Sequence, residues 1–387
     1  MNVDAVRSRF SSLQKGFAFF DAPGGTQVPD EVGQAIANAL REASGNLGAP
    51  YATGRAVEAI LERAKADAAR FLGATPEEIS FGMNMTTLNF ALSRAAGRDF
   101  AGGDEVLTTE LDHDGGVAPW VELAADRELV VRVARATDEL TIDYDDLERL
   151  LGARTRVVAF ALASNATGSL ADAKRICAMA REAGAISWID AVHYAAHEPI
   201  DVIELGCDVL LCSPYKFCGP HLGISYVRRE LAETWRPYKA RPSSSTPVGR
   251  RFETGTLPYE LLAGFSATIA YLDSIGGMTE VREYERALGE RFIEGLPAGV
   301  TLYGAPTMDG RVPTFLFNVD GVPAVDVAQR LADRGIGVWS ADNWYCVALA
   351  PRLPEQSVRA GIAHYNTEEE LERLLAELQA LSSSAAS

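Results

Sequence analysis

The chain has 387 residues, of which 47% are apolar, and its 36 Lys and Arg residues against 53 Asp and Glu residues give a net charge of −17. This length is sufficient for two packed domains. The acidic balance, without a basic run of five or more residues, argues against binding to nucleic acids or to anionic membranes. No stretch of about 18 apolar residues is present to span a bilayer, and residues 1–16 lack the pattern of an export signal. We therefore expect a cytoplasmic globular protein.

The cysteines are five in number and lie mostly in apolar runs, at positions 177, 207, 212, 218 and 346. An odd number in a long chain favours reduced thiols over a disulfide framework. Their spacing forms no paired CxxC motif of the kind that binds zinc, so we expect no metal site.

The first two thirds of the chain, from about residue 17 to 255, alternate short apolar runs with helical periodicity, which predicts a mostly parallel sheet covered by helices. Helices are expected over 56–72 and 172–183, each followed by a glycine. Strands are expected over 79–81, 105–108, 157–161, 186–190 and 209–212.

A Pro-, Ser- and Gly-rich segment, 239–251, predicts a surface loop, and the pattern changes after it. The remainder predicts helices over 261–277, 324–334 and 367–381, strands over 313–319, 336–340 and 358–365, and a disordered tail over 382–387. We therefore predict a large domain over 17–255, and a small C-terminal α+β domain made of 256–387 together with 1–16.

Two polar residues follow apolar strands where α/β proteins bind ligands. Lys216 comes just after the strand 209–212, and Asp190 ends the strand 186–190. A lysine beside an apolar strand has a lowered pKa and is suited to Schiff-base chemistry, although a lone lysine is usually solvated. An amine and a carboxylate at neighbouring strand ends are what pyridoxal phosphate requires, the first for its aldehyde and the second for its ring nitrogen. For Asp190 alone, a helix N-cap is the alternative.

These motifs resemble the class V aminotransferase family of fold-type I pyridoxal phosphate enzymes, and within it the cysteine desulfurase-like subgroup. The resemblance runs from FDAPGGTQVP (20–29) to VRAGIAHYNT (358–367). It implies that Lys216 in SPYKFCGP carries the cofactor and that Asp190 in IDAVH pairs with the ring nitrogen.

The same resemblance gives roles to further residues around the cofactor. His113 in ELDHDGGVAPW is similar to the histidine that stacks on the ring and shuttles protons. His193 occupies the position that contacts the ring hydroxyl, where desulfurases typically carry Gln, and Asn165 in ASNATGS lies near that hydroxyl and the substrate.

A phosphate site is implied where FGMNMTTLNF turns from a strand into a helix, because a helix N-terminus offers N–H donors to an anion. Met85, Thr86 and Ser213 would hold the phosphate. Thr256 in FETGT resembles the residue that a second subunit contributes, which implies a homodimer. An ordinary helix start is the alternative for Met85 and Thr86.

The substrate side of the site is implied by Arg359, which resembles the arginine that binds the substrate α-carboxylate through a bidentate fork. Its alternative is a surface arginine on a strand. The retained motif around it, His364 to Thr367, favours the binding role.

Cys346 in ADNWYCVALA lies about where desulfurases carry their cysteine nucleophile. The RxGHHCA and SSGSAC patterns are absent, and a buried structural cysteine is an equal alternative because a reactive thiol needs an exposed, electropositive site. Tyr215, which stands where histidine commonly precedes the lysine, and the segments FDAPGGTQVP and GNLGAPYATGRA also depart from the family pattern.

The implied function is a pyridoxal-phosphate-dependent reaction on an α-amino acid. C–S bond cleavage of cysteine or a cysteine conjugate comes first, as a desulfurase with a sulfur acceptor or as a C–S lyase. Transamination or epimerisation of a specialised amino acid without a cysteine nucleophile is the alternative. A binding protein that keeps only the fold is a third possibility, which the presence of both Lys216 and Asp190 disfavours.

Overall fold

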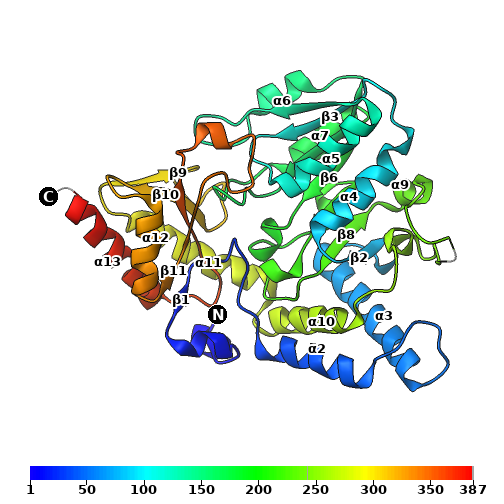
Figure 1. The fold of residues 1–387 in the computed structure, drawn as a ribbon, viewed down its shortest axis with the longest axis horizontal. Helices are drawn as coiled ribbons and strands as arrows, with labels where there is room; N and C mark the ends of the chain where they lie inside the picture. Colours follow the sequence, from blue (N-terminus) through cyan, green and yellow to red (C-terminus); the bar gives the residue numbers. More distant parts are fainter. Residues whose placement is uncertain (242, 386–387) are drawn as a thin grey trace.

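The computed structural model describes residues 1–241 and 243–385. Its centre is a seven-stranded sheet in the order β2-β8-β7-β6-β5-β3-β4 (Figure 1). Only β8 runs against the other six strands. The strands are β2 (Ile79–Gly82), β3 (Glu105–Thr109), β4 (Val130–Ala134), β5 (Thr155–Ala161), β6 (Ile186–Asp190), β7 (Val209–Cys212) and β8 (Gly223–Val227).

Both faces of this sheet are covered, which explains why its strands are continuous apolar runs in the sequence. Side chains alternate between the faces, so Leu210 and Cys212 of β7 pack in one core while Val209 and Leu211 pack in another. The first core is closed by α3 (Ala52–Leu72), α7 (Ala173–Glu182) and α10 (Tyr259–Ser274), and the second by α4 (Met85–Ala96) and α5 (Asp114–Arg127).

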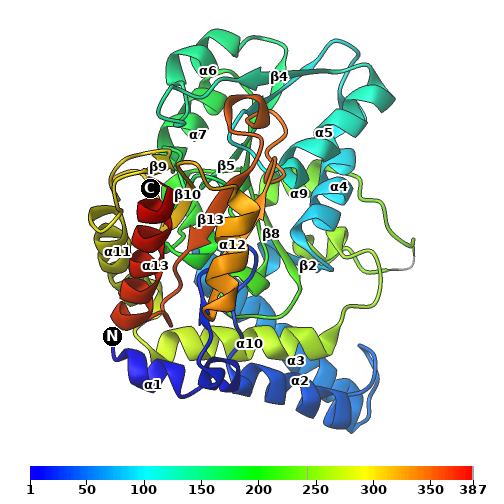
Figure 2. The same ribbon diagram turned by 60° about the vertical axis from the view of Figure 1, so that its left-hand side comes forward.

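A four-stranded antiparallel sheet in the order β12-β13-β10-β9 has its own core at one end of the molecule (Figures 1 and 2). Its strands are β9 (Val300–Tyr303), β10 (Thr314–Val319), β12 (Trp339–Ala341) and β13 (Ser357–Gly361), and its helices are α11 (Gly277–Glu294), α12 (Ala324–Asp333) and α13 (Glu368–Ala385). The N-terminal segment joins it, since β1 (Ala18–Phe19) pairs in parallel with β11 (Ile336–Gly337).

The strands 186–190 and 209–212 are confirmed residue for residue, and the helix 172–183 forms as α7, with Asp172 as its N-cap. The helix predicted over 261–277 is wrong in extent, because α10 ends at Ser274 and α11 begins at Gly277, with Gly276 between them at positive φ. The strand predicted over 336–340 is two short strands, and the strand over 358–365 ends at Gly361.

The C-terminal tail predicted to be disordered from residue 382 is instead helical as far as Ala385, and residues 386–387 lie outside the described part of the chain. The predicted loop 239–251 is irregular until a 3₁₀ turn at Val248–Phe252, and residue 242 within it also lies outside the described residues.

The division into two domains at residue 255 stays a prediction. Helix α10, which follows that point, packs against α2 (Asp30–Glu42) and α3, and its buried residues share the core of the larger sheet. Among the described residues, no single helix is long and apolar enough to cross a membrane; α10 and α11 reach that threshold only when taken together, with a 67° bend between them.

Candidate active site

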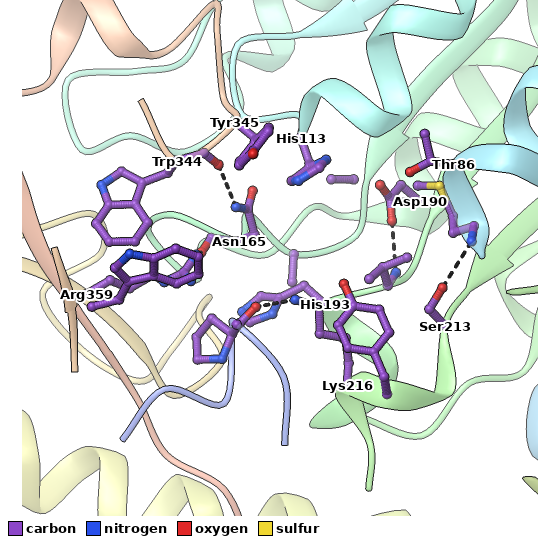
Figure 3. A pocket seen from close by; sticks show the side chains of 18 of the residues that line it. Thr86, His113, Asn165, Asp190, His193, Ser213, Lys216, Trp344, Tyr345 and Arg359 are labelled. Atoms are coloured by element: carbon purple, nitrogen blue, oxygen red, sulfur yellow. Dashed lines mark hydrogen bonds between the residues drawn. The ribbon is translucent and has the colours of Figure 1, made fainter. Parts of the chain in front are cut away.

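A cavity of about 280 Å³ opens where the carboxyl ends of the larger sheet face the smaller one (Figure 3). Residues that follow β2, β3, β5, β6 and β7 line one side of it, because the carboxyl ends of parallel strands meet at one edge of a sheet. The other side comes from Pro23 and Gly24, from the segment 341–345, and from Trp339 and Arg359.

Lys216 lies four residues beyond the end of β7 and is only 8% exposed. Its Nζ donates to the carbonyl of Pro23, in the N-terminal segment. Burial, followed by the positive charge of Arg359, lowers the pKa of this amine to about 7. A substantial fraction of the amine is therefore unprotonated at neutral pH, as a nucleophile must be.

Asp190 faces the same cavity from the end of β6, the strand beside β7. One carboxylate oxygen accepts a hydrogen bond from the backbone N–H of Val192, at 2.9 Å. Burial, with a smaller contribution from the negative charge of Asp112, raises the pKa of Asp190 to about 7. Such a carboxyl group can share a proton with a bound basic nitrogen.

His113 caps the N-terminus of α5, and its Nδ1 accepts from the backbone N–H of Gly115, at 2.9 Å. Its ring stacks on that of Tyr345, with centroids 5.4 Å apart. Burial, and then the charges of Lys216 and Arg359, lower the pKa of His113 to about 4, so the imidazole is neutral at physiological pH.

His193 lines the cavity as a buried side chain held by Thr314, whose hydroxyl lies 2.9 Å from Nε2. Its Nδ1 has no hydrogen-bond partner among the described residues. Burial holds the pKa of this histidine well below its usual value. Buried polar atoms are normally satisfied, so this nitrogen is available to a bound group.

The start of α4 meets the end of β7 at the cavity wall, where the backbone N–H of Met85 donates to Ser213 Oγ at 3.1 Å. Asn84 caps the helix by accepting from the N–H of Thr87. The cavity thus includes a helix N-terminus and two hydroxyl groups, those of Thr86 and Ser213, which suit a phosphate. Thr256 is exposed and is not among the described residues that line the cavity.

Arg359 of β13 is 3% exposed and reaches the cavity from the smaller sheet. One guanidinium nitrogen donates to the backbone carbonyl of Asn165 at 2.9 Å, and another lies 3.6 Å from Asp21. Burial lowers the pKa of Arg359 to about 10, which still leaves it charged at neutral pH. Its Nε is buried without a partner in the part of the chain that the structure describes.

Cys346 does not line the cavity among the residues described. Its side chain is fully buried, and its thiol contacts Asn165 Oδ1 at 3.1 Å. Burial raises the pKa of this thiol to about 12, which disfavours the thiolate that a nucleophile requires.

Several residues at the site were not predicted. Asp112, beside His113, and Asp21, within the segment 20–29, were overlooked even though both are acidic residues in motifs that carried the resemblance. Trp339, Trp344 and Tyr345 add aromatic walls. No local pattern marks them as site residues, because they reach the cavity only through the packing of the two sheets.

The class V aminotransferase family model ("Aminotransferase class-V") matches residues 18–374. The chain belongs to this family. This class V enzyme is 35% identical to "Probable cysteine desulfurase 2" of Mycobacterium leprae, over 97% of this chain and 96% of that protein. It is 30% identical to "Aminotransferase-like protein FGM3" of Gibberella zeae, over 98% of each.

A solved structure of the apo form of a cysteine desulfurase from Thermococcus onnurineus superposes on this class V enzyme with a TM-score of 0.93, at 27% identity over 98% of each chain. The α/β architecture is therefore that of the fold-type I pyridoxal phosphate enzymes, as the resemblance implied. The site fits that cofactor, because it supplies an amine, an acid, an unsatisfied histidine nitrogen and a helix N-terminus around one cavity.

Proposed function

We propose that this class V enzyme cleaves the C–S bond of cysteine or a cysteine conjugate with bound pyridoxal phosphate. The observation that carries the proposal is the convergence of Lys216, Asp190 and Arg359 on one cavity (Figure 3). The name cysteine desulfurase, borne by similar proteins over nearly their whole length, supports the substrate.

The cofactor, when bound, supplies an aldehyde for the substrate amine and a ring that accepts the electrons left at Cα. We propose that Lys216 binds the cofactor and then moves the Cα proton with its amine, whose lowered pKa suits a general base. His113, neutral at physiological pH and accepting from Gly115 at Nδ1, carries its proton on Nε2 and is the second proposed proton-transfer group, as a donor.

The remaining site residues are proposed to bind and orient the substrate and the cofactor. Arg359 holds the substrate carboxylate with Asn165 beside it, and Asp190 keeps the ring nitrogen protonated. The other proposed cofactor ligands are His193, Met85, Thr86, Ser213 and, from a second subunit, Thr256. A homodimer is supported by the exposure of Thr256 outside the cavity of its own chain.

We propose that the sulfur leaves the substrate by elimination, as in a C–S lyase. The sulfur then leaves with the bonding electron pair and is protonated to a thiol or sulfide, while the carbon fragment is hydrolysed to pyruvate and ammonia. The burial of Cys346 supports this route over transfer to an enzyme thiol, which would give alanine and a persulfide for a sulfur acceptor.

A second candidate is transamination or epimerisation of a specialised amino acid, which needs no thiol. The same burial of Cys346 favours it. In either case, we propose that the enzyme works in the cytoplasm.

The test is a product screen of the purified holoenzyme with cysteine, cystine, cysteine conjugates and sulfur-free amino acids. We expect sulfide or thiol with equimolar pyruvate from at least one sulfur compound, and none from the Lys216→Ala variant. Products from sulfur-free amino acids alone would overturn the proposal in favour of the second candidate. Alanine with a persulfide on Cys346 would overturn the elimination route.

A further inference from the structure

The segment Asn343–Cys346 forms a tight turn in the cavity wall. The backbone N–H of Cys346 donates to the carbonyl of Asn343 at 2.8 Å, and the residues between them, Trp344 and Tyr345, have φ values of 53° and 58°. Two consecutive side-chain-bearing residues in the left-handed region persist only where their surroundings hold them.

Two contacts from other segments of the chain hold the carbonyl groups of this turn. The side-chain amide nitrogen of Asn165 donates to the carbonyl of Trp344 at 2.8 Å, and the backbone N–H of Asp114 donates to the carbonyl of Tyr345 at 2.6 Å. The turn is therefore tied to the segments that carry Asn165 and His113.

The thiol of Cys346 contacts the same Asn165 amide that donates to the Trp344 carbonyl. It donates to Asn165 Oδ1 at 3.1 Å, and lies 3.9 Å from the carbonyl of Leu111. The amide of Asn165 thus accepts at its oxygen and donates at its nitrogen, and turning it over would place its oxygen against the Trp344 carbonyl. The two contacts together fix one orientation of this amide.

Arg359 is positioned by the same two residues. It donates to the backbone carbonyl of Asn165 at 2.9 Å, and its Cζ lies 4.4 Å from the centre of a Trp344 ring. The labelled side chains of Asn165, Trp344 and Arg359 lie together on one side of the cavity (Figure 3). The unpartnered Nε of Arg359 is a second sign that this wall is built for a ligand, since the atom is buried and no described residue satisfies it.

We propose that Cys346 is a positioning residue: its thiol orients the Asn165 amide, which holds Trp344 and Arg359 in place for the substrate carboxylate. The inference rests on the proposed carboxylate role of Arg359, and it gives this cysteine a function without a thiolate. It requires the proton on sulfur, whereas a nucleophile requires its loss.

The test uses the holoenzyme and glycine, which has a carboxylate and an amine but no sulfur, so that binding is measured as a change in cofactor absorbance without C–S cleavage. We expect Cys346→Ala to weaken glycine binding by about three- to tenfold, in line with the loss of one hydrogen bond. Cys346→Ser, which keeps a donor, should restore most of the affinity.

Cys177→Ala is the matched control, because Cys177 is equally buried but lies on α7, away from the cavity. It should lower the melting temperature and leave glycine binding unchanged. If the thiol acts through Asn165, the double variant Asn165→Ala/Cys346→Ala should bind glycine no more weakly than Asn165→Ala alone.

Glycine affinity in Cys346→Ala equal to that of the wild type would overturn the inference, and so would independent, additive effects in the double variant. Loss of sulfur release in both the Ala and Ser variants, with glycine binding intact, would instead assign Cys346 as the nucleophile. If no sulfur compound reacts, the proposed C–S cleavage is overturned but the inference on Cys346 is not, because glycine binding is measured in a separate experiment.

Discussion

Asp112 lies behind Asp190, and the two carboxyl groups line one small cavity beneath the site. Asp112 is buried and accepts from the backbone N–H of Ala161, the residue paired with Asp190 between β5 and β6. The pKa of Asp190 is therefore raised to about 7 by burial and by a second acid that the sheet holds in place.

The contribution of Asp190 to the stability of the apoprotein should fall as the pH rises from about 4 to about 7. A carboxyl group whose pKa is raised on folding stabilises the native state below its unfolded pKa, and that contribution is lost as the pH rises through the folded value. For Asp190 the loss is up to about 4 kcal/mol. Urea unfolding of the apoprotein at pH 5 and pH 7.5 measures it, and Asp190→Asn should flatten the difference. An unchanged slope in that variant would show that other groups are responsible.

Attachment of pyridoxal phosphate to the apoprotein should accelerate with pH, with a midpoint near 7, because Lys216 reacts as the unprotonated amine and its pKa is lowered to about 7. Stopped-flow absorbance follows the reaction. Borohydride reduction and peptide mass spectrometry then locate the label on Lys216. Labelling of the exposed Lys174 instead, or a midpoint near 10, would contradict the expectation.

Arg359→Lys should weaken glycine binding to the holoenzyme by about tenfold or more, because a lysine cannot supply the guanidinium fork. Arg352→Lys is a control on the same stretch of chain, since Arg352 bonds to Glu110 and to backbone carbonyls outside the cavity. Equal affinities in the two variants would remove Arg359 from the carboxylate site.

A buried cluster of Glu285, His197 and His364 should make the stability of the protein depend on pH in the alkaline range. Glu285 lies 2.6 Å from His197 and 3.7 Å from His364, whose Nε2 contacts the Tyr271 hydroxyl. Burial alone lowers the pKa of His364, but Cys218 and Glu285 outweigh it and raise the value to about 9. The stabilising contribution of His364 is therefore complete below about pH 6.5 and is lost as the pH rises through about 9.

Glu285→Gln should cost about 3–5 kcal/mol at neutral pH, since it leaves buried partners without their charge, and it should reduce the decline in stability between pH 6.5 and 9. Glu283→Gln, an exposed change on the same helix, is the control. Chemical unfolding at three pH values measures the free energy of unfolding of each variant. Equal losses of stability in both variants would contradict the prediction.

The bounds of β6 and β7 were predictable from the sequence, because both strands are short apolar runs that end at a polar residue or a turn. Sequence reasoning also gathered Lys216, Asp190, His113, His193 and Arg359 as candidates, and all five line one cavity. Lys216, Asp190, His113 and His193 were predictable as candidates because each lies at or shortly after a strand end in a recognisable motif.

The environment of Cys346 was not predictable. Its partner Asn165 is 181 residues away, and the turn before it has two left-handed residues, neither of which is glycine. Periodicity and local propensity carry no information on such contacts, so a buried thiol and a reactive one remained equal alternatives in the sequence.

The short segment between β1 and Gly24 connects the two sheets directly. Phe20 is hydrogen-bonded to Gly337 of β11 and to Gly361 of the smaller sheet, and three residues later the Pro23 carbonyl accepts a hydrogen bond from the Lys216 amine. Because only two residues separate Phe20 from Pro23, the hydrogen-bond partner of the buried amine has its position fixed by the smaller sheet.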